Sequence, residues 1–160
     1  MIRCTFENGN KTSLRHITVN AIVVKNNQIL LGKRGTFNKK PILESGKWGL
    51  LGGFFDRDEN LVQAVKREVM EESGWEIDNL KLLRINDNPN RPKEDRQNVD
   101  FIFIAKAIKQ LKTSDEEVKE LKWFSFDNLP PKDSIAFDHG DALELFLKYL
   151  KENFNLPVLG

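Results

Sequence analysis

The stretch from residue 53 to residue 75, GFFDRDENLVQAVKREVMEESGW, constrains the fold most, because its spacing predicts a helix that carries three clustered glutamates. Side chains three and four residues apart meet on a helix, so Glu68, Glu71 and Glu72 share an arc of roughly 100°. No Lys or Arg follows any of them at the fourth position, where a salt-bridged surface helix would place one. A counter-cation must come from elsewhere, and clustered carboxylate oxygens are the ligands that Mg²⁺ prefers.

The ends of this helix are marked by residue types that favour helix termini. We expect it to span residues 59 to 73. Asp56, Asp58 and Glu59 are acids that suit a helix N-terminus, and Gly74 stands where a C-terminal cap would. Four apolar residues at helical spacing form the expected core-facing stripe: Leu61, Val62, Val65 and Val69.

Length and composition indicate a single globular domain over residues 1–160. The chain has 160 residues and 39% hydrophobic content, which is enough to bury a core without disulfides. Cys4 is its only cysteine, so it offers neither an internal disulfide nor a cysteine metal cluster. The N-terminus lacks the apolar core of a signal peptide, and no apolar run is long enough to span a membrane. We therefore expect a cytoplasmic protein without a membrane partner.

The charge balance gives no general argument for a nucleic-acid partner. The 25 basic and 24 acidic residues leave a formal net charge of +1. No basic stripe marks a track for DNA or RNA. Any affinity for phosphate must therefore be local.

The spacing around the three glutamates resembles the signature of the Nudix hydrolases. Gly53, five residues, Glu59, seven residues and then REVMEESGW at 67–75 match that signature position by position. Three positions depart from the usual pattern without removing a carboxylate: Leu51, Asp58 and Trp75. The resemblance implies an α/β/α sandwich in which a mixed β-sheet lies between helices, with the site formed by the 59–73 helix and its loops.

Hydrophobic patterns outside the signature predict further strands and a second helix. The expected strands are residues 16–24, 28–32, 81–85, 101–106 and 120–124, and the family pattern adds a short strand at 48–55. An amphipathic helix is expected at residues 140–154, with Asp138 as its cap. Residues 1–15 are too polar for core and are a candidate arm that reaches a second copy in a homodimer. His16 and His139 stand alone, which favours structural roles.

The resemblance implies a metal site and positioning residues. Glu68, Glu71 and Glu72 would hold Mg²⁺, for which Mn²⁺ is a candidate substitute, and Arg67 would orient them. Glu59 is expected to pair with Arg67 or Lys66. The backbone carbonyl of Gly52 is a further candidate ligand.

A loop acid is also expected to act, as a metal ligand or as the base that activates water. Glu116 is the first choice and Glu117 the second. The alternative for both residues is an exposed acidic turn. Glu68 on the helix competes with Glu116 for the role of base.

Four residues are candidates for binding substrate, and each has a structural alternative. Arg34 would face the phosphates, or else only protect a solvated sheet edge. Trp48 would stack on a base, or else belong to the core. Arg91 and Arg96 would touch phosphate or ribose, or else lie on a solvated loop between strands.

The inventory of motifs leaves metal-assisted attack of water on a phosphoanhydride as the expected chemistry. No Ser-His-Asp, Cys-His, Walker or Rossmann pattern is present. The resemblance favours a Mg²⁺-dependent hydrolase that cleaves the pyrophosphate bond of a nucleoside diphosphate linked to another moiety, such as ADP-ribose or a similar nucleotide sugar. The alternatives are a nucleoside triphosphate pyrophosphohydrolase, including one for oxidised nucleotides, and a non-catalytic nucleotide-binding module.

Overall fold

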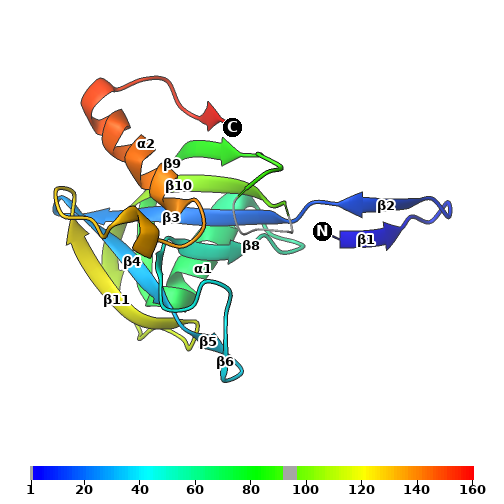
Figure 1. Ribbon diagram of the computed structural model, residues 1–160, viewed down its shortest axis with the longest axis horizontal. Coiled ribbons are helices and arrows are strands. Elements are labelled where there is room, and N and C mark those ends of the chain that lie inside the picture. The colour runs from blue at the N-terminus through cyan, green and yellow to red at the C-terminus, as the bar shows by residue number, and fades with distance from the viewer. Residues whose placement is uncertain (1, 92–96) are drawn as a thin grey trace.

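The computed structural model describes residues 2–91 and 97–160. Figure 1 shows a twisted sheet with helices on both sides and a hairpin that projects from the body. The elements in chain order are β1 Ile2–Thr5, β2 Lys11–Leu14, β3 Ile17–Lys25, β4 Gln28–Arg34, β5 Thr36–Phe37, β6 Lys40–Pro41, β7 Trp48–Gly49, β8 Leu51–Phe54, α1 Leu61–Ser73, β9 Trp75–Asn86, β10 Val99–Gln110, β11 Val118–Ser125, the 3₁₀ turn η1 Lys132–Ser134, α2 His139–Glu152 and β12 Val158–Leu159.

The main sheet is mixed, as expected. Its strand order is β11-β4-β3-β10-β9-β12, with β7 paired to β4 and β8 paired to β3. The pairs β3–β10 and β9–β12 are parallel, and the other pairs are antiparallel. All the predicted strands are present, but β9 and β10 each run for 12 residues, about twice the expected length. The predicted strand 48–55 is divided at Leu50 into β7 and β8.

Alternation along β3 places one hydrophobic core on each face of the sheet. Val19, Ala21 and Val23 point to the face that α1 covers, together with Val65 of that helix. Ile22 points the other way, into a core that contains apolar residues of α2. The α/β/α arrangement predicted from the sequence is therefore confirmed (Figure 1).

Helix α1 begins two residues later than predicted. Its cap is Asn60, whose side chain accepts the Gln63 N–H while the Gln63 side chain accepts the Asn60 N–H. Glu59 lies before the cap and accepts the Asp56 N–H at 2.8 Å. Gly74 ends the helix in the left-handed conformation at φ 70°, as predicted.

The predicted core stripe of α1 was wrong at Val62, which is 44% exposed. At about 100° per residue, Val62 lies at the edge of the buried arc, and it belongs to the first turn of the helix. Ala64, which was not predicted, is fully buried in its place, beside Val65 and Val69.

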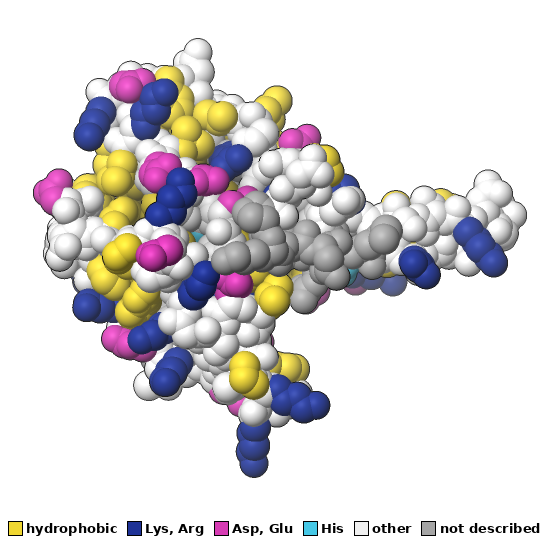
Figure 2. Space-filling model, viewed as in Figure 1, with side chains coloured by type: hydrophobic (Ala, Val, Ile, Leu, Met, Phe, Trp, Pro, Cys, Tyr) yellow, Lys and Arg dark blue, Asp and Glu magenta, His cyan; other side chains and the backbone are white. Residues whose placement is uncertain are grey.

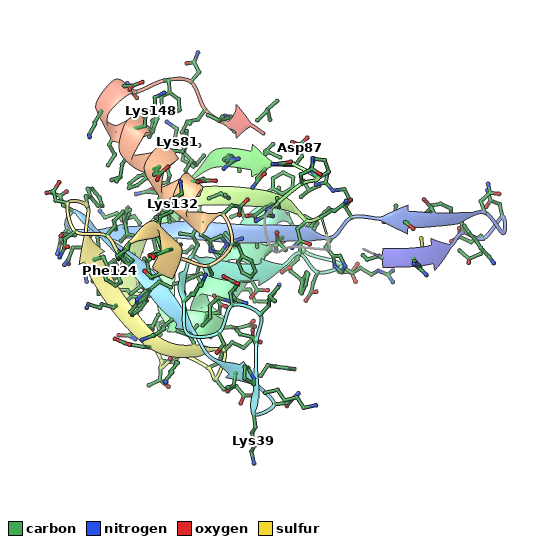
Figure 3. The ribbon with its side chains drawn as sticks, in the orientation of Figure 1. Lys39, Lys81, Asp87, Phe124, Lys132 and Lys148 are labelled. Atoms are coloured by element: carbon green, nitrogen blue, oxygen red, sulfur yellow. The ribbon has the colours of Figure 1, made fainter. Side chains whose placement is uncertain are left out.

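Helix α2 starts after Asp138 as predicted, but the Asp138 side chain makes no cap hydrogen bond. It binds Asn86 and Arg91 instead. The side chain of Lys132, labelled in Figure 3, links η1 to this helix through Asp141 at 2.6 Å and Glu144 at 3.0 Å.

Residues 2–14 form the hairpin β1–β2, which extends away from the sheet (Figure 1). Ile2, Phe6 and Leu14 are between 43% and 47% exposed on it. The shape is that of the predicted arm, whereas its contact with a second copy stays a prediction.

Acidic and basic side chains are interspersed over the face shown in Figure 2. Neither helix in the described ranges has the length and apolar character required to cross a bilayer.

Candidate active site

A cleft of about 520 Å³ collects the acidic side chains of α1 and residues from several other parts of the chain. Its lining is Thr18, Asn20, Arg34, Phe37, Ile42, Leu43, Gly52, Gly53, Phe54, Glu68, Glu71, Glu72, Arg91, Asn98, Asp115, Glu117, Phe137 and His139. The three predicted helix glutamates therefore face the same space as Arg34, Gly52 and Arg91.

Glu72 is the most deeply buried of the three glutamates, at 9% exposure. One carboxylate oxygen accepts the Gly52 N–H at 2.8 Å. Burial raises the pKa of Glu72 to about 8, and the negative charge of Glu68 adds to this shift. Within residues 2–91 and 97–160, Glu72 forms no ion pair. A buried carboxylate in this state favours a proton or an added cation.

Glu68 lies directly against the backbone of β8. A Cβ at Gly53 would stand 2.6 Å from a Glu68 carboxylate oxygen, so any larger residue there would displace the Glu68 carboxylate from its position against β8. Burial raises the pKa of Glu68, although its hydrogen bond with Arg67 opposes the shift. The backbone of β8 thus holds two glutamates, Glu68 by close packing and Glu72 by a hydrogen bond.

Arg67 joins the helix glutamates to the residues before the helix. Its guanidinium donates to Glu59 at 2.8 and 3.1 Å, to Glu68 at 2.9 Å and to Glu71 at 3.2 Å. It also donates to the Phe54 carbonyl at 3.1 Å. The predicted pairing of Glu59 with Arg67 is confirmed. The hydrogen bonds that Arg67 donates to the Glu59 carboxylate are the largest cause of the raised pKa of Arg67, so this residue remains a cation.

Arg67, which precedes the three glutamates in the chain, therefore neutralises part of their negative charge. Arg67 stands four residues before Glu71 and next to Glu68. The sequence pattern considered only basic residues four positions after each glutamate, so it did not identify Arg67 as their partner. Among the ion pairs of the described residues, none joins Arg67 to Glu72.

The acidic loop before β11 does not bring Glu116, the first predicted residue, into the cleft. Glu116 accepts the Asn38 N–H at 3.0 Å and is not part of the cleft lining. Its neighbours Asp115 and Glu117 line the cleft, and the Glu117 N–H donates to the Asp115 side chain at 3.0 Å within this turn. Burial raises the pKa of both, and the charge of Glu71 contributes to each shift. Glu117 was the second choice, and Asp115 was not predicted.

Arg34 stands in the cleft as the sequence predicted, and Trp48 does not. The Nε of Arg34 donates to the Leu43 carbonyl at 2.8 Å, and its guanidinium lies 4.9 Å from the ring centre of Phe137. Trp48 packs edge-on against Phe124 at 4.9 Å, on a separate hollow of about 420 Å³ (Phe124 is labelled in Figure 3). The structure does not bring Trp48 to the glutamates.

Arg91 belongs to the cleft wall, so the solvated-loop alternative was wrong for this residue. It is 8% exposed and holds Asp138 with two hydrogen bonds of 2.7 and 2.9 Å. Arg96, the other loop candidate, lies outside the described residues.

His139 lines the cleft, although no pattern in the sequence predicts it there. Its Nδ1 accepts the Leu50 N–H at 3.0 Å, which leaves the ring proton on Nε2. Burial lowers the pKa of His139 to about 3, although the Asp138 charge opposes the shift. The imidazole is thus neutral at physiological pH. An isolated histidine in the sequence carries no signal for such a position.

The chemistry of the donors fits a hard divalent cation. Five carboxylates face the cleft, and oxygen ligands of this kind suit Mg²⁺ or Mn²⁺. In the part of the chain that the structure describes, no three acidic, His or Cys side chains converge closely enough to hold a metal ion. Arg67 draws Glu68 and Glu71 to itself, so a cation would have to compete with this guanidinium for them.

The fold and the cleft together define an α/β/α protein with a carboxylate-rich site beside arginines. The model of the NUDIX domain family matches residues 14–146, so the chain belongs to that family. Pyrophosphohydrolase activity is the reaction class that this membership supports.

Three relatives illustrate the similarity. An ADP-ribose pyrophosphatase from Methanocaldococcus jannaschii is 30% identical over 133 residues, which are 83% of this chain and 73% of the relative. An NAD-capped RNA hydrolase NudC from Vibrio vulnificus is 34% identical over 92 residues, 57% of this chain and 33% of that protein. The chain therefore matches only about a third of NudC. The NUDIX domain of Shewanella oneidensis NrtR, solved with ADP ribose, has a TM-score of 0.69 and 25% identity, and the match covers 87% of this chain and 90% of that domain.

Proposed function

We propose that this protein hydrolyses the pyrophosphate bond of a nucleoside diphosphate joined to a second moiety, with ADP-ribose as the favoured substrate and Mg²⁺ as the cation. The observation that carries the proposal is the gathering of α1 and loop carboxylates in one cleft with Arg34. The archaeal relative named ADP-ribose pyrophosphatase and the NrtR domain bound to ADP ribose support the choice of substrate.

Glu68, Glu71 and Glu72 would hold the cation, and the Gly52 carbonyl is a further candidate. When bound, a divalent cation supplies neutralisation of phosphate charge and a lower pKa for attacking water. Arg67 positions Glu68 and Glu71 through hydrogen bonds of 2.9 and 3.2 Å. Arg34 would stabilise the negative charge of the departing phosphate.

The proton of the attacking water would pass to a carboxylate in the cleft. Glu68 on the helix and Glu117 or Asp115 on the loop are the candidates, because burial raises the pKa of each and all three face the cleft. A base with a raised pKa is better matched to neutral pH. Water attacks one phosphorus, the bridging P–O bond breaks, and ADP-ribose would yield AMP and ribose 5-phosphate.

The test is incubation of the purified protein with Mg²⁺ or Mn²⁺ and a panel of ADP-ribose, other nucleotide sugars, NAD, and normal and oxidised nucleoside triphosphates, followed by mass analysis of products. AMP with ribose 5-phosphate is the expected result. Pyrophosphate from a triphosphate would transfer support to the alternative pyrophosphohydrolase. Tight binding without turnover of any compound would favour the non-catalytic nucleotide-binding module.

A further inference from the structure

The wall of the cleft that includes Arg91 is built around a buried ion pair. Arg91 and Asp138 have side chains only 5% and 8% exposed, and Asn86 donates to the same Asp138 carboxylate at 2.6 Å. Two parallel hydrogen bonds between a guanidinium and a carboxylate fix both side chains. This wall is therefore rigid and its charges are largely matched.

The next layer of the wall is also ordered by hydrogen bonds. Asp100 is fully buried, and its Oδ1 accepts from the Thr18 hydroxyl at 3.0 Å and from the Asn20 amide at 2.8 Å. Thr18 and Asn20 line the cleft, and the Thr18 hydroxyl and one N–H of the Asn20 amide are committed to Asp100. Thr18 therefore has no donor left for a ligand acceptor.

Asn98 carries a neutral acceptor without a partner, whereas the other acceptor of this wall without a hydrogen bond, the Asp100 Oδ2, lies 3.8 Å from the Arg91 guanidinium. It is 7% exposed and lines the cleft, and its Oδ1 is buried. No donor within residues 2–91 and 97–160 reaches this oxygen. Native structures leave few buried acceptors without a donor, because the lost hydration is not recovered. The last torsion of an Asn side chain is soft, and rotation about it is the motion that would present this buried oxygen to a ligand in the cleft.

The chemistry of an acceptor selects which part of a substrate can bind there. A carbonyl oxygen requires an N–H or O–H donor, and an ionised phosphate group presents mainly acceptors. Phe54, which is 42% exposed, lines the same cleft and offers an apolar surface for a ring. A sugar supplies both features, since its hydroxyls donate and its carbon framework is apolar.

We infer that Asn98 is a specificity-determining residue that accepts a hydrogen bond from a sugar hydroxyl of the substrate. The sugar then lies against the Asn98 wall while the phosphates face the glutamates of α1. This inference rests on the proposed function and makes it more specific, because it assigns an orientation to the substrate within the cleft.

The test is calorimetric binding of three probes, inorganic phosphate, ribose 5-phosphate and AMP, to the full chain in the presence of Mg²⁺. Asn98→Leu removes the acceptor, with Asn98→Ala as a second variant in case leucine prevents folding. Asn128→Leu, at an exposed position outside the cleft, is the matched control. We expect Asn98→Leu to weaken ribose 5-phosphate binding about tenfold, or about 1.4 kcal/mol. Phosphate affinity should not change, and the control should behave as the wild type.

Four results would overturn the inference. Ribose 5-phosphate affinity could be the same in wild type and Asn98 variants, phosphate affinity could fall in parallel, or the loss could appear with AMP alone, which would indicate the base amino group. Wild-type protein that binds ribose 5-phosphate no more tightly than phosphate would also contradict it. The assay needs no turnover, so hydrolysis with no Asn98 effect refutes only the orientation, and an Asn98 effect without hydrolysis refutes only the proposed reaction.

Discussion

Two charged regions meet in the same cleft, and they are neutralised in different ways. The Arg91–Asp138 region is closed by two short hydrogen bonds and by Asn86. The α1 region brings Glu68, Glu71 and Glu72 together with two loop acids, and Arg67 reaches only part of it. The difference teaches that the charges of the first region are matched within the fold, whereas the second region keeps acids that Arg67 neutralises only in part, as the proposed cation site requires.

Removal of the Asp138 carboxylate is the substitution that should disrupt the Arg91–Asp138 region most. Asp138→Ala leaves the Arg91 guanidinium buried without its main carboxylate, which should lower the free energy of unfolding by about 3–5 kcal/mol. Urea unfolding measures this loss. Asp127→Ala, at an exposed position, is the control and should cost little. An Asp138 variant as stable as the control would show that the pair is not structural.

The α1 region should respond in the opposite way, with loss of activity and retention of fold. Glu71→Gln or Glu72→Gln should lower kcat by about 10³-fold, or about 4 kcal/mol, because each removes a carboxylate that would hold the cation. Steady-state kinetics with ADP-ribose and circular dichroism measure the two properties. Exposed Glu76→Gln is the control. Full activity in both cleft variants would refute the metal assignment.

The two loop acids provide a matched pair within the acidic region. Glu117 faces the cleft and Glu116 binds the Asn38 N–H instead. Glu117→Gln should therefore reduce kcat by about 10²-fold, as expected for loss of a base, whereas Glu116→Gln should stay within about twofold of wild type. The reverse order of effects would restore Glu116 as the acting residue.

A smaller effect is expected on the pH dependence of the free energy of unfolding, through His139, which lies between the two regions. His139 has a folded pKa of about 3 against 6.5 for the free side chain. Between these values the unfolded chain binds the extra proton, so the contribution of His139 is lost as pH falls from about 6.5 toward 3. The stability difference between wild type and His139→Gln should shift against the wild type by about 1.4 kcal/mol per pH unit in this window.

Urea unfolding of both proteins at pH 7, 6 and 5 measures that difference. Comparison of the two proteins is necessary because Glu72, with its raised pKa, acts with the opposite sign: its contribution is present at low pH and is lost as pH rises through about 8. His16→Gln is the control. A difference that does not change with pH would contradict the neutral, buried state of His139.

Local spacing explains what could be predicted from the sequence. Glu68, Glu71 and Arg67 are neighbours on one helix, so residue intervals alone place them together. The strands and the two cores follow from alternating apolar residues in the same local way. The end of α1 was also readable, because Gly74 favours the left-handed cap conformation.

Contacts between distant parts of the chain explain what could not be predicted. The burial of Arg91 depends on Asp138, 47 residues away, and the tautomer of His139 depends on Leu50, 89 residues away. The choice between Glu116 and Glu117 depends on which of the two side chains faces the cleft. Both residues are glutamates, so residue type cannot distinguish them. Pairing with neighbouring strands likewise extended β9 and β10 beyond their apolar segments.

The most direct test of the contrast between the two regions is thermal unfolding with and without Mg²⁺ near pH 7.5. Mg²⁺ at about 100 times its dissociation constant should stabilise the wild type by about 2.7 kcal/mol. Glu72→Gln should be more stable than the wild type without metal, because it removes a buried carboxyl group whose raised pKa costs stability at this pH, and should gain little from Mg²⁺. A wild-type protein whose unfolding temperature does not respond to Mg²⁺ or Mn²⁺, or a Glu72→Gln variant that responds fully, would contradict the assignment of this cleft as a cation site.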